Sequence, residues 1–359
     1  MTFYKRRISA HLELNTQCNA MCSMCYDRNY IDDSLELKSR ELLPSHYLSE
    51  NDINRIFDDD FLASFSLKKI IFCGTRSEPS LNPDLFEIIR LLAQKIPSLC
   101  IYISTNGATH TPSWWSSLAQ NLQLYSKHHQ VVFCIDGLED THSIYRINTS
   151  YQDIIHRAQA FIQSGGRASW QFLVFQHNQH QINAARGLAK DYGFEDFVLK
   201  YTNYFKKNNL EQLKFAYKGK KYLISPSDTG KGDGDSAVIP TGQDCIKCYA
   251  REDNSFYIDA FANVYPCSFL STAILGGHPS GMHDPADSDL WPITSQVNAL
   301  QRSLKDILLD SPAWAKLAAR WANKSTSPLV CTKMCGSQDS HMCDFARDEN
   351  ERITQQELF

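Results

Sequence analysis

The sequence has no apolar run near the roughly 18–20 residues that a membrane-spanning helix needs. It also has no excess of positive charge, because 36 Lys and Arg face 40 Asp and Glu, for a net charge of −4. Neither a membrane partner nor a nucleic-acid partner is therefore indicated. The basic start, which includes Lys5 to Arg7, leads into Ile8 without the apolar core of a signal peptide. This favours a cytoplasmic protein.

The composition also argues against disorder and against a scaffold held by disulfides. Hydrophobic residues make up 43% of the 359 residues, which is enough for a sizeable core. The 12 cysteines fall well below the ~8–10% that is typical of short secreted disulfide scaffolds. In a reducing cytosol, clustered cysteines indicate metal ligands. The length allows two domains, or one barrel with an appendage.

Residues 8–202 alternate short apolar runs with segments of helical spacing. The runs are rich in Ile, Val and Phe, as expected for parallel strands buried on both faces. The strands are expected at 8–15, 67–74, 100–107, 130–137, 168–178 and 194–202, and the helices at 51–62, 84–95, 113–122, 152–163 and 181–192.

Six successive β/α units predict an α/β fold, a partial (β/α)6 TIM-like barrel. A doubly wound parallel sheet is the alternative that periodicity does not exclude. In either fold, reactive groups lie at the C-terminal ends of the strands.

The pattern changes after about residue 205. Residues 225–236 are rich in Ser, Gly and Asp, which predicts a loop or linker. A second region follows, with a hairpin at 255–269, an amphipathic helix at 300–309 and a cysteine-rich tail. We therefore expect a barrel at 1–205, a linker and hairpin at 206–244, and a small C-terminal cysteine-rich α+β domain at 245–359.

Three cysteines, Cys18, Cys22 and Cys25, follow the first predicted strand with the spacing C-x3-C-x2-C. Three thiolates on one loop can converge on one metal centre. A structural zinc site uses four protein ligands, and an electron-transfer [4Fe–4S] cluster uses four cysteines. Three cysteines would therefore leave one iron open. The alternatives are a zinc site completed by a distant residue, and thiols that are close in sequence alone.

This spacing after a first strand resembles the signature of the radical S-adenosylmethionine (SAM) superfamily. The segment from Gly74 to Pro79 is similar to the family's glycine-rich SAM-binding motif, with Ser77 in place of the usual glycine. Met24 stands where an aromatic residue is common. Polar residues of the kind that contact SAM in the family follow later predicted strands, at Ser104, Asn106, Asp136 and Asn178.

The resemblance implies a mechanism and a set of cofactor contacts. Cys18, Cys22 and Cys25 would hold a [4Fe–4S] cluster whose open iron binds the amino and carboxylate groups of SAM. One electron, supplied by a flavodoxin-type or ferredoxin-type donor, would cleave SAM to methionine and a 5′-deoxyadenosyl radical, which abstracts a substrate hydrogen. The residues expected to bind SAM are Gly74, Ser77, Glu78, Ser104, Asn106, Asp136 and Asn178, with Glu78 at the ammonium group.

The C-terminal region carries six further cysteines. Residues 257–267 resemble the β-hairpin of SPASM and Twitch domains, in which cysteines before and after the hairpin ligate an auxiliary [4Fe–4S] cluster. Asn263, near the usual hairpin glycine, tolerates a positive φ. A full SPASM domain needs seven or more cysteines, so six favour the Twitch form with one cluster. The expected ligands are Cys248, Cys267, Cys331 and Cys335.

Alternatives to this ligand set are Cys245 in place of Cys248, a structural zinc site, and a cluster that lacks one protein ligand and binds substrate instead. Cys245 and Cys343 lie outside the expected set. One of them is a candidate hydrogen-atom donor in a redox-neutral epimerisation, and the alternative for each is an unligated structural cysteine.

Two substrate classes compete. Twitch-type dehydrogenases, which this chain resembles in size and layout, imply oxidation or epimerisation of a small molecule such as a sugar, an aminocyclitol or a nucleotide derivative. The alternative is modification of a peptide or protein. Peptide modifiers often carry a leader-recognition domain before the barrel, and 17 residues precede Cys18 here, which favours the small molecule. A non-enzymatic iron–sulfur or zinc scaffold is a third class, against which the SAM-like strand ends argue.

Overall fold

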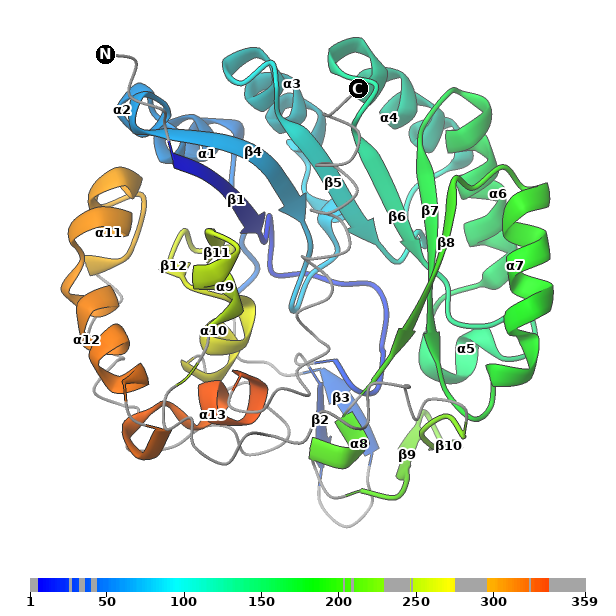
Figure 1. The fold of residues 1–359 in the computed structure, drawn as a ribbon. Helices are drawn as coiled ribbons and strands as arrows, with labels where there is room; N and C mark the ends of the chain where they lie inside the picture. The colour runs from blue at the N-terminus through cyan, green and yellow to red at the C-terminus, as the bar shows by residue number, and fades with distance from the viewer. Residues whose placement is uncertain are drawn as a thin grey trace.

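Six parallel strands form the wall of an open barrel (Figure 1). The computed structural model describes residues 6–25, 28–31, 36–39, 44–202, 204–207, 210–228, 246, 248–274, 296–322 and 324–335. The barrel strands are β1 (Arg6–Leu12), β4 (Phe65–Phe72), β5 (Cys100–Thr105), β6 (Gln130–Cys134), β7 (Ala168–Val174) and β8 (Asp196–Tyr201).

The order of these strands in space is their order in the sequence, because each pairs in parallel with the next. A doubly wound sheet would reverse the strand order partway across. The sheet has no such reversal over its six β/α strands. The predicted partial TIM-like barrel is therefore confirmed.

Helices cover the outer face of the barrel (Figure 1). They are α1 (Glu50–Ile56), α2 (Asp59–Ser64), α3 (Leu85–Lys95), α4 (Pro112–Tyr125), α6 (Tyr151–Gln163) and α7 (Ile182–Asp191). The 3₁₀ turn η1 (Pro79–Leu81), the short helix α5 (His142–Tyr145) and the 3₁₀ turn η2 (Gln179–Gln181) lie in the segments that follow β4, β6 and β7. The single helix expected at 51–62 is two helices. The chain turns at Asp58, whose side chain accepts the N–H of Phe61 and so begins a second helix.

The main core lies between the strands and these helices. Alternate strand residues such as Phe72, Ile103 and Trp170 are fully buried there. Their strand neighbours point to the other face, where Ser104 and Gln171 both lie near the Cys134 thiol. The barrel interior is therefore partly polar, which suits a site that receives a polar ligand.

The C-terminal region adds two strands to the barrel sheet. β11 (Ser255–Ile258) pairs in parallel with β1, and β12 (Val264–Tyr265) pairs antiparallel with β11. The predicted hairpin is present, but its left-handed residue is Ala262, with φ 65°, and not Asn263. The Asp259 carboxylate accepts the N–H groups of Phe261 and Asn263, which fixes the turn on either side of Ala262.

The remaining C-terminal helices lie beside β11 and β12 (Figure 1). They are α9 (Tyr249–Glu252), α10 (Ser268–Ile274), α11 (Leu304–Asp310), α12 (Pro312–Trp321) and α13 (Leu329–Cys335), with the 3₁₀ turn η4 (Lys324–Thr326). The helix expected at 300–309 begins later than predicted. Residues before it form a turn in which the Asn298 side chain accepts the N–H of Leu300.

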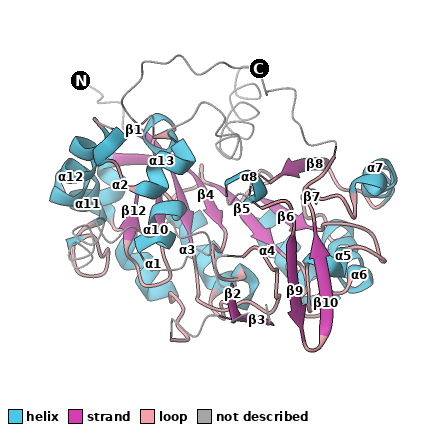
Figure 2. Ribbon diagram, turned by 90° about the horizontal axis from the view of Figure 1, so that it is seen from below, coloured by secondary structure: helices cyan, strands magenta, loops and turns pink. Residues whose placement is uncertain are grey.

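A second, four-stranded sheet lies beyond the C-terminal ends of the barrel strands (Figures 1 and 2). Its order is β10 (Lys220–Ile224), β9 (Leu213–Tyr217), β3 (Glu36–Ser39) and β2 (Arg28–Ile31), and the short α8 (Tyr204–Lys207) lies between β8 and β9 in the chain. The hairpin expected between the two predicted domains corresponds to β9 and β10. None of the described helices is long and apolar enough to cross a membrane.

Candidate functional site

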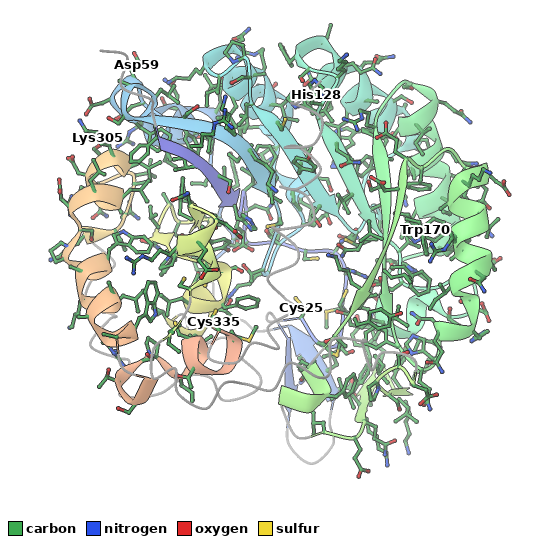
Figure 3. All side chains as sticks on the ribbon, viewed as in Figure 1. Cys25, Asp59, His128, Trp170, Lys305 and Cys335 are labelled. Carbon is green, nitrogen blue, oxygen red and sulfur yellow. The ribbon has the colours of Figure 1, made fainter. Side chains whose placement is uncertain are left out.

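Three thiols gather on the loop that follows β1. Cys25 lies inside the curve of the barrel strands (Figure 3), and the backbone N–H of Met21 donates to Ile147 to hold the loop. Each sulfur atom has a polar neighbour from another loop: Asn106 Nδ2 at 3.7 Å from Cys18, Arg146 Nη1 at 3.7 Å from Cys22, and the Thr75 carbonyl oxygen at 3.6 Å from Cys25.

The loop is electrostatically suited to a cationic metal centre. Burial raises the pKa of the Cys18 thiol well above its usual range, and Glu78, Cys22 and Cys25 raise it further. Three thiolates and a carboxylate repel one another unless a cation lies among them. The donor set therefore fits an iron–sulfur cluster held by three cysteines.

The loop after β4 makes a tight turn between Gly74 and Ser77. A Cβ atom on Gly74 would lie 1.9 Å from the carbonyl oxygen of Ser77, so no other residue fits without moving the turn. Ser77 itself turns inward, and both its N–H and its hydroxyl donate to Glu13 at 3.1 Å.

Glu13, one residue past β1, holds this loop. Its Oε1 atom also accepts the N–H of Arg76 at 2.8 Å, and its Oε2 atom accepts the hydroxyls of Thr75 and Tyr257. The Glu13 side chain is buried, and burial raises its pKa while the hydrogen bonds from Tyr257 and the loop lower it.

Glu78, which was expected at the SAM ammonium group, is bound within the chain. Its Oε1 atom accepts the hydroxyls of Ser80 and Thr105, and its Oε2 atom accepts the N–H of Asn106 at 2.7 Å. Burial raises its pKa, and these hydrogen bonds oppose the rise. Glu78 thereby joins the loop after β4 to the end of β5. Its contact with SAM stays a prediction.

Asn106 connects that junction to the cysteine loop. Its side-chain amide donates to the Asn19 side chain at 2.8 Å and points to the Cys18 sulfur. Ser104, two residues earlier on β5, lies 3.6 Å from the Cys134 sulfur on the inner face of the barrel. Ser104 and Asn106, two residues apart, therefore lie on the same face at the end of β5.

Asp136 forms a buried ion pair with Arg146, a residue that we did not predict. The Arg146 Nε atom lies 2.6 Å from Asp136 Oδ2, and the Leu173 N–H donates to the other carboxylate oxygen. Asn178 closes the arrangement by donating to the backbone carbonyl groups of Asp136 and Leu173. Asp136 and Asn178 thus position the Arg146 guanidinium beside Cys22.

Replacing Arg146 by Met is expected to lower the free energy of unfolding by about 3–5 kcal/mol, because it leaves a buried carboxylate without its cation. The Asp136 side chain is fully buried. Urea denaturation would measure the change. The matched control is Arg167→Met, since the Arg167–Glu195 pair is 35% and 39% exposed and should cost less than about 1 kcal/mol. Equal losses in the two variants would contradict the prediction.

Four more thiols line a second cavity, in the C-terminal region. They are the four predicted auxiliary ligands, Cys248, Cys267, Cys331 and Cys335. Cys248 directly precedes α9, and Cys267 lies between β12 and α10. Cys331 and Cys335 lie on α13, where Figure 3 labels Cys335. The other side chains that line this cavity are apolar. Burial raises the pKa of the Cys267 thiol, and Cys248 and Cys331 raise it further.

These residues fit a cluster with four cysteine ligands. Trp321 also lines the cavity, and its indole N–H is buried without a hydrogen-bond partner, so it could donate to a sulfur atom of a bound group. Over the described ranges, no three His, Cys, Asp or Glu side chains are arranged to hold a single metal ion. The corners of a cubane cluster lie apart, so its ligands need not point at one atom. Cys245 and Cys343 lie outside the described residues.

Three residues that matter to this geometry were missed in the sequence: Glu13, Arg146 and Tyr257. Glu13 carried a signal, since a charged side chain between two buried leucines at a strand end is unusual. Arg146 and Tyr257 carried none, because an arginine in a loop and a tyrosine in a strand are common. Their roles follow from partners that are distant in sequence.

The sequence matches no family profile. A protein of Pyrococcus furiosus, described as the tungsten-containing aldehyde ferredoxin oxidoreductase cofactor-modifying protein, is 26% identical over 110 residues. The match spans 31% of this chain and 27% of that protein. The chain therefore aligns with about a quarter of this relative.

Solved structures share the fold, among them SuiB and anSMEcpe. SuiB of Streptococcus suis, bound to S-adenosylmethionine, has a TM-score of 0.54 at 15% identity, over 88% of this chain and 68% of SuiB. The protein anSMEcpe, with bound AdoMet, has a TM-score of 0.51 at 14% identity, over 93% of this chain and 92% of its own. At this identity the likeness shows the fold, and it extends across both the barrel and the C-terminal region.

Proposed function

We propose that this chain, which has the fold of radical SAM enzymes, cleaves SAM reductively and uses the resulting radical to abstract a hydrogen atom from its substrate. The observation that carries the proposal is the convergence of Cys18, Cys22 and Cys25 beside the loop of Gly74 to Glu78. Both features lie at the C-terminal ends of barrel strands, where such folds bind their ligands.

The three cysteines would hold a [4Fe–4S] cluster. When bound and reduced, it supplies one electron that splits SAM into methionine and a 5′-deoxyadenosyl radical. The chain's own residues then bind and orient SAM. The turn at Gly74 leaves the Thr75 carbonyl oxygen near Cys25, where it can accept a hydrogen bond from an ammonium group. Arg146 places a positive charge beside Cys22, which favours the more negative, reduced state of a centre bound there.

The four thiols of the C-terminal cavity would hold one auxiliary [4Fe–4S] cluster, as in the Twitch arrangement. Support comes from the gathering of Cys248, Cys267, Cys331 and Cys335 in one apolar cavity. An apolar wall excludes water from a bound cluster. Such a cluster could accept the second electron when a substrate radical is oxidised.

For the substrate we propose a small polar molecule that is oxidised or epimerised, with an electron donor of the flavodoxin or ferredoxin type. The polar inner face of the barrel, with Ser104, Cys134 and Gln171 in contact, supports a compact polar ligand. A peptide is the second candidate. It is favoured by two structures of the same fold, SuiB bound to the precursor peptide SuiA and anSMEcpe bound to AdoMet and the Cp18Cys peptide.

The test is anaerobic reconstitution with iron and sulfide, followed by dithionite and SAM, with 5′-deoxyadenosine as the readout. We expect 5′-deoxyadenosine in amounts that depend on dithionite. Panels of aminocyclitols, sugars and nucleotides in one arm, and of peptides in the other, should show which class accelerates its formation. Protein that carries both clusters and forms no 5′-deoxyadenosine would contradict the proposed function.

A further inference from the structure

One tyrosine of the C-terminal region, Tyr257, contacts the loop after β4 (Gly74 to Glu78), for which we propose SAM binding. Tyr257 lies on β11, which pairs with β1. In the sequence, Tyr257 is 244 residues from Glu13. Its hydroxyl donates to Glu13 Oε2 and lies 2.6 Å from the Thr75 hydroxyl. The loop after β4 and the strand β11 therefore meet at a single carboxylate.

The two carboxylate oxygen atoms of Glu13 accept hydrogen bonds from different donors. Oε1 accepts three donors of the loop, namely the Arg76 N–H, the Ser77 N–H and the Ser77 hydroxyl. Oε2 is held by Tyr257 and Thr75. Without the tyrosine hydroxyl, the carboxylate can rotate about its last side-chain bond, and the directions of the three loop hydrogen bonds change with it.

Water cannot replace the missing hydroxyl without a change in packing. Tyr257 is 1% exposed and Glu13 is 4% exposed. A buried charge that loses one donor depends more strongly on those that remain. These remaining donors belong to the loop whose Thr75 carbonyl oxygen faces Cys25.

We propose that Tyr257 is a positioning residue through which the C-terminal region sets the geometry of the SAM-binding loop. The residue does not touch SAM; it acts through Glu13 on the backbone from Thr75 to Ser77. The proposal rests on the proposed function, since that function assigns SAM to this loop.

The experiment compares Tyr257→Phe with the wild type as reconstituted holoenzyme. The dissociation constant of SAM is measured by equilibrium dialysis, and the rate of 5′-deoxyadenosine formation is measured at saturating SAM. We expect SAM to bind about tenfold more weakly, because a hydrogen bond to a carboxylate is lost. The rate at saturation and the iron content should stay at wild-type values, since the cysteines are untouched.

The matched control is Tyr265→Phe. Tyr265 faces Tyr257 in the same hairpin and is also buried, but its hydroxyl takes no part in the Glu13 network. We expect this variant to bind SAM as the wild type does. If both variants weaken SAM binding equally, damage to the hairpin explains the loss and the proposal is overturned.

Thr75→Val provides an independent variant, because it removes the other hydroxyl at Oε2 and keeps the side-chain shape. We expect weaker SAM binding here too, and less than additive loss when it is combined with Tyr257→Phe. Wild-type affinity in Tyr257→Phe and Thr75→Val would overturn the inference alone. A wild-type holoenzyme that does not bind SAM would instead overturn the proposed function.

Discussion

The triple variant Cys18→Ala, Cys22→Ala, Cys25→Ala is expected to form no 5′-deoxyadenosine while it keeps about four irons per chain. The three sulfur atoms lie together on the loop after β1, and no other described cysteine belongs to that loop. With all three removed, no ligand remains for the cluster that would reduce SAM. Iron analysis and chromatographic detection of 5′-deoxyadenosine after dithionite reduction measure both results.

The control for this variant is Cys100→Ala. Cys100 begins β5, at the end of the strand opposite to the site, and pairs with Lys69 of β4. The Cys100→Ala variant should retain about eight irons per chain and form 5′-deoxyadenosine as the wild type does. Reductive cleavage of SAM by the triple variant would show that the active site lies elsewhere. Loss of all iron from the triple variant would show that the two metal sites are not independent.

The second large effect concerns the C-terminal cavity, where Cys267→Ala is expected to remove about four of about eight irons. Cys267 directly follows the hairpin and lies close to Cys248 and Cys331. Because the barrel thiols are unchanged, the variant should still cleave SAM. It should fail to complete an oxidised product, since the proposed acceptor of the second electron is absent.

Iron and zinc analysis of the wild type separates the alternatives for this cavity. About four irons and one zinc would indicate a structural zinc site, and about twelve irons would indicate a full SPASM domain. A Cys267→Ala variant that keeps its full iron content would remove this residue from the ligand set. Comparison with Cys100→Ala again controls for the loss of a thiol as such.

The order and direction of the barrel strands could be predicted from the sequence, but the points where they end could not. In the run at 8–15, apolar and polar residues alternate up to Asn15, and in the run at 168–178 apolar residues continue to Phe175. Periodicity therefore extends both strands past the points where they end. In the structure β1 stops at Leu12, and the Asn15 side chain then donates to the Glu78 carbonyl. β7 stops at Val174, where the Asn178 side chain accepts the N–H of Phe175 and turns the chain. Side-chain hydrogen bonds, which have no periodicity, end both strands.

In the candidate site, too, some features could be predicted from the sequence and others could not. The cysteine spacing on the loop after β1 is a local feature, and it identified the first group of thiols. The second group was expected from the resemblance to the Twitch hairpin, and the fold brings Cys331 and Cys335 of α13 to it. The partners of the polar strand-end residues are not local. Asp136, for which a contact with SAM stays a prediction, pairs with Arg146. Glu78, whose contact with the SAM ammonium group stays a prediction, accepts hydrogen bonds from Ser80, Thr105 and Asn106. Only the folded chain shows which donors reach a buried carboxylate.

The pairing of β11 with β1 has a consequence for how the chain folds during synthesis. β1 leaves the ribosome before its neighbours in the sheet, and the neighbour on one side, β4, follows soon after. On the other side of β1, Ser9 cannot pair until Ser255 of β11 has been synthesised. Until then β1 is an edge strand with unpaired backbone groups, the kind of surface on which partly made chains associate. We expect slow folding, limited by this closure, because contacts between residues so far apart in sequence form late.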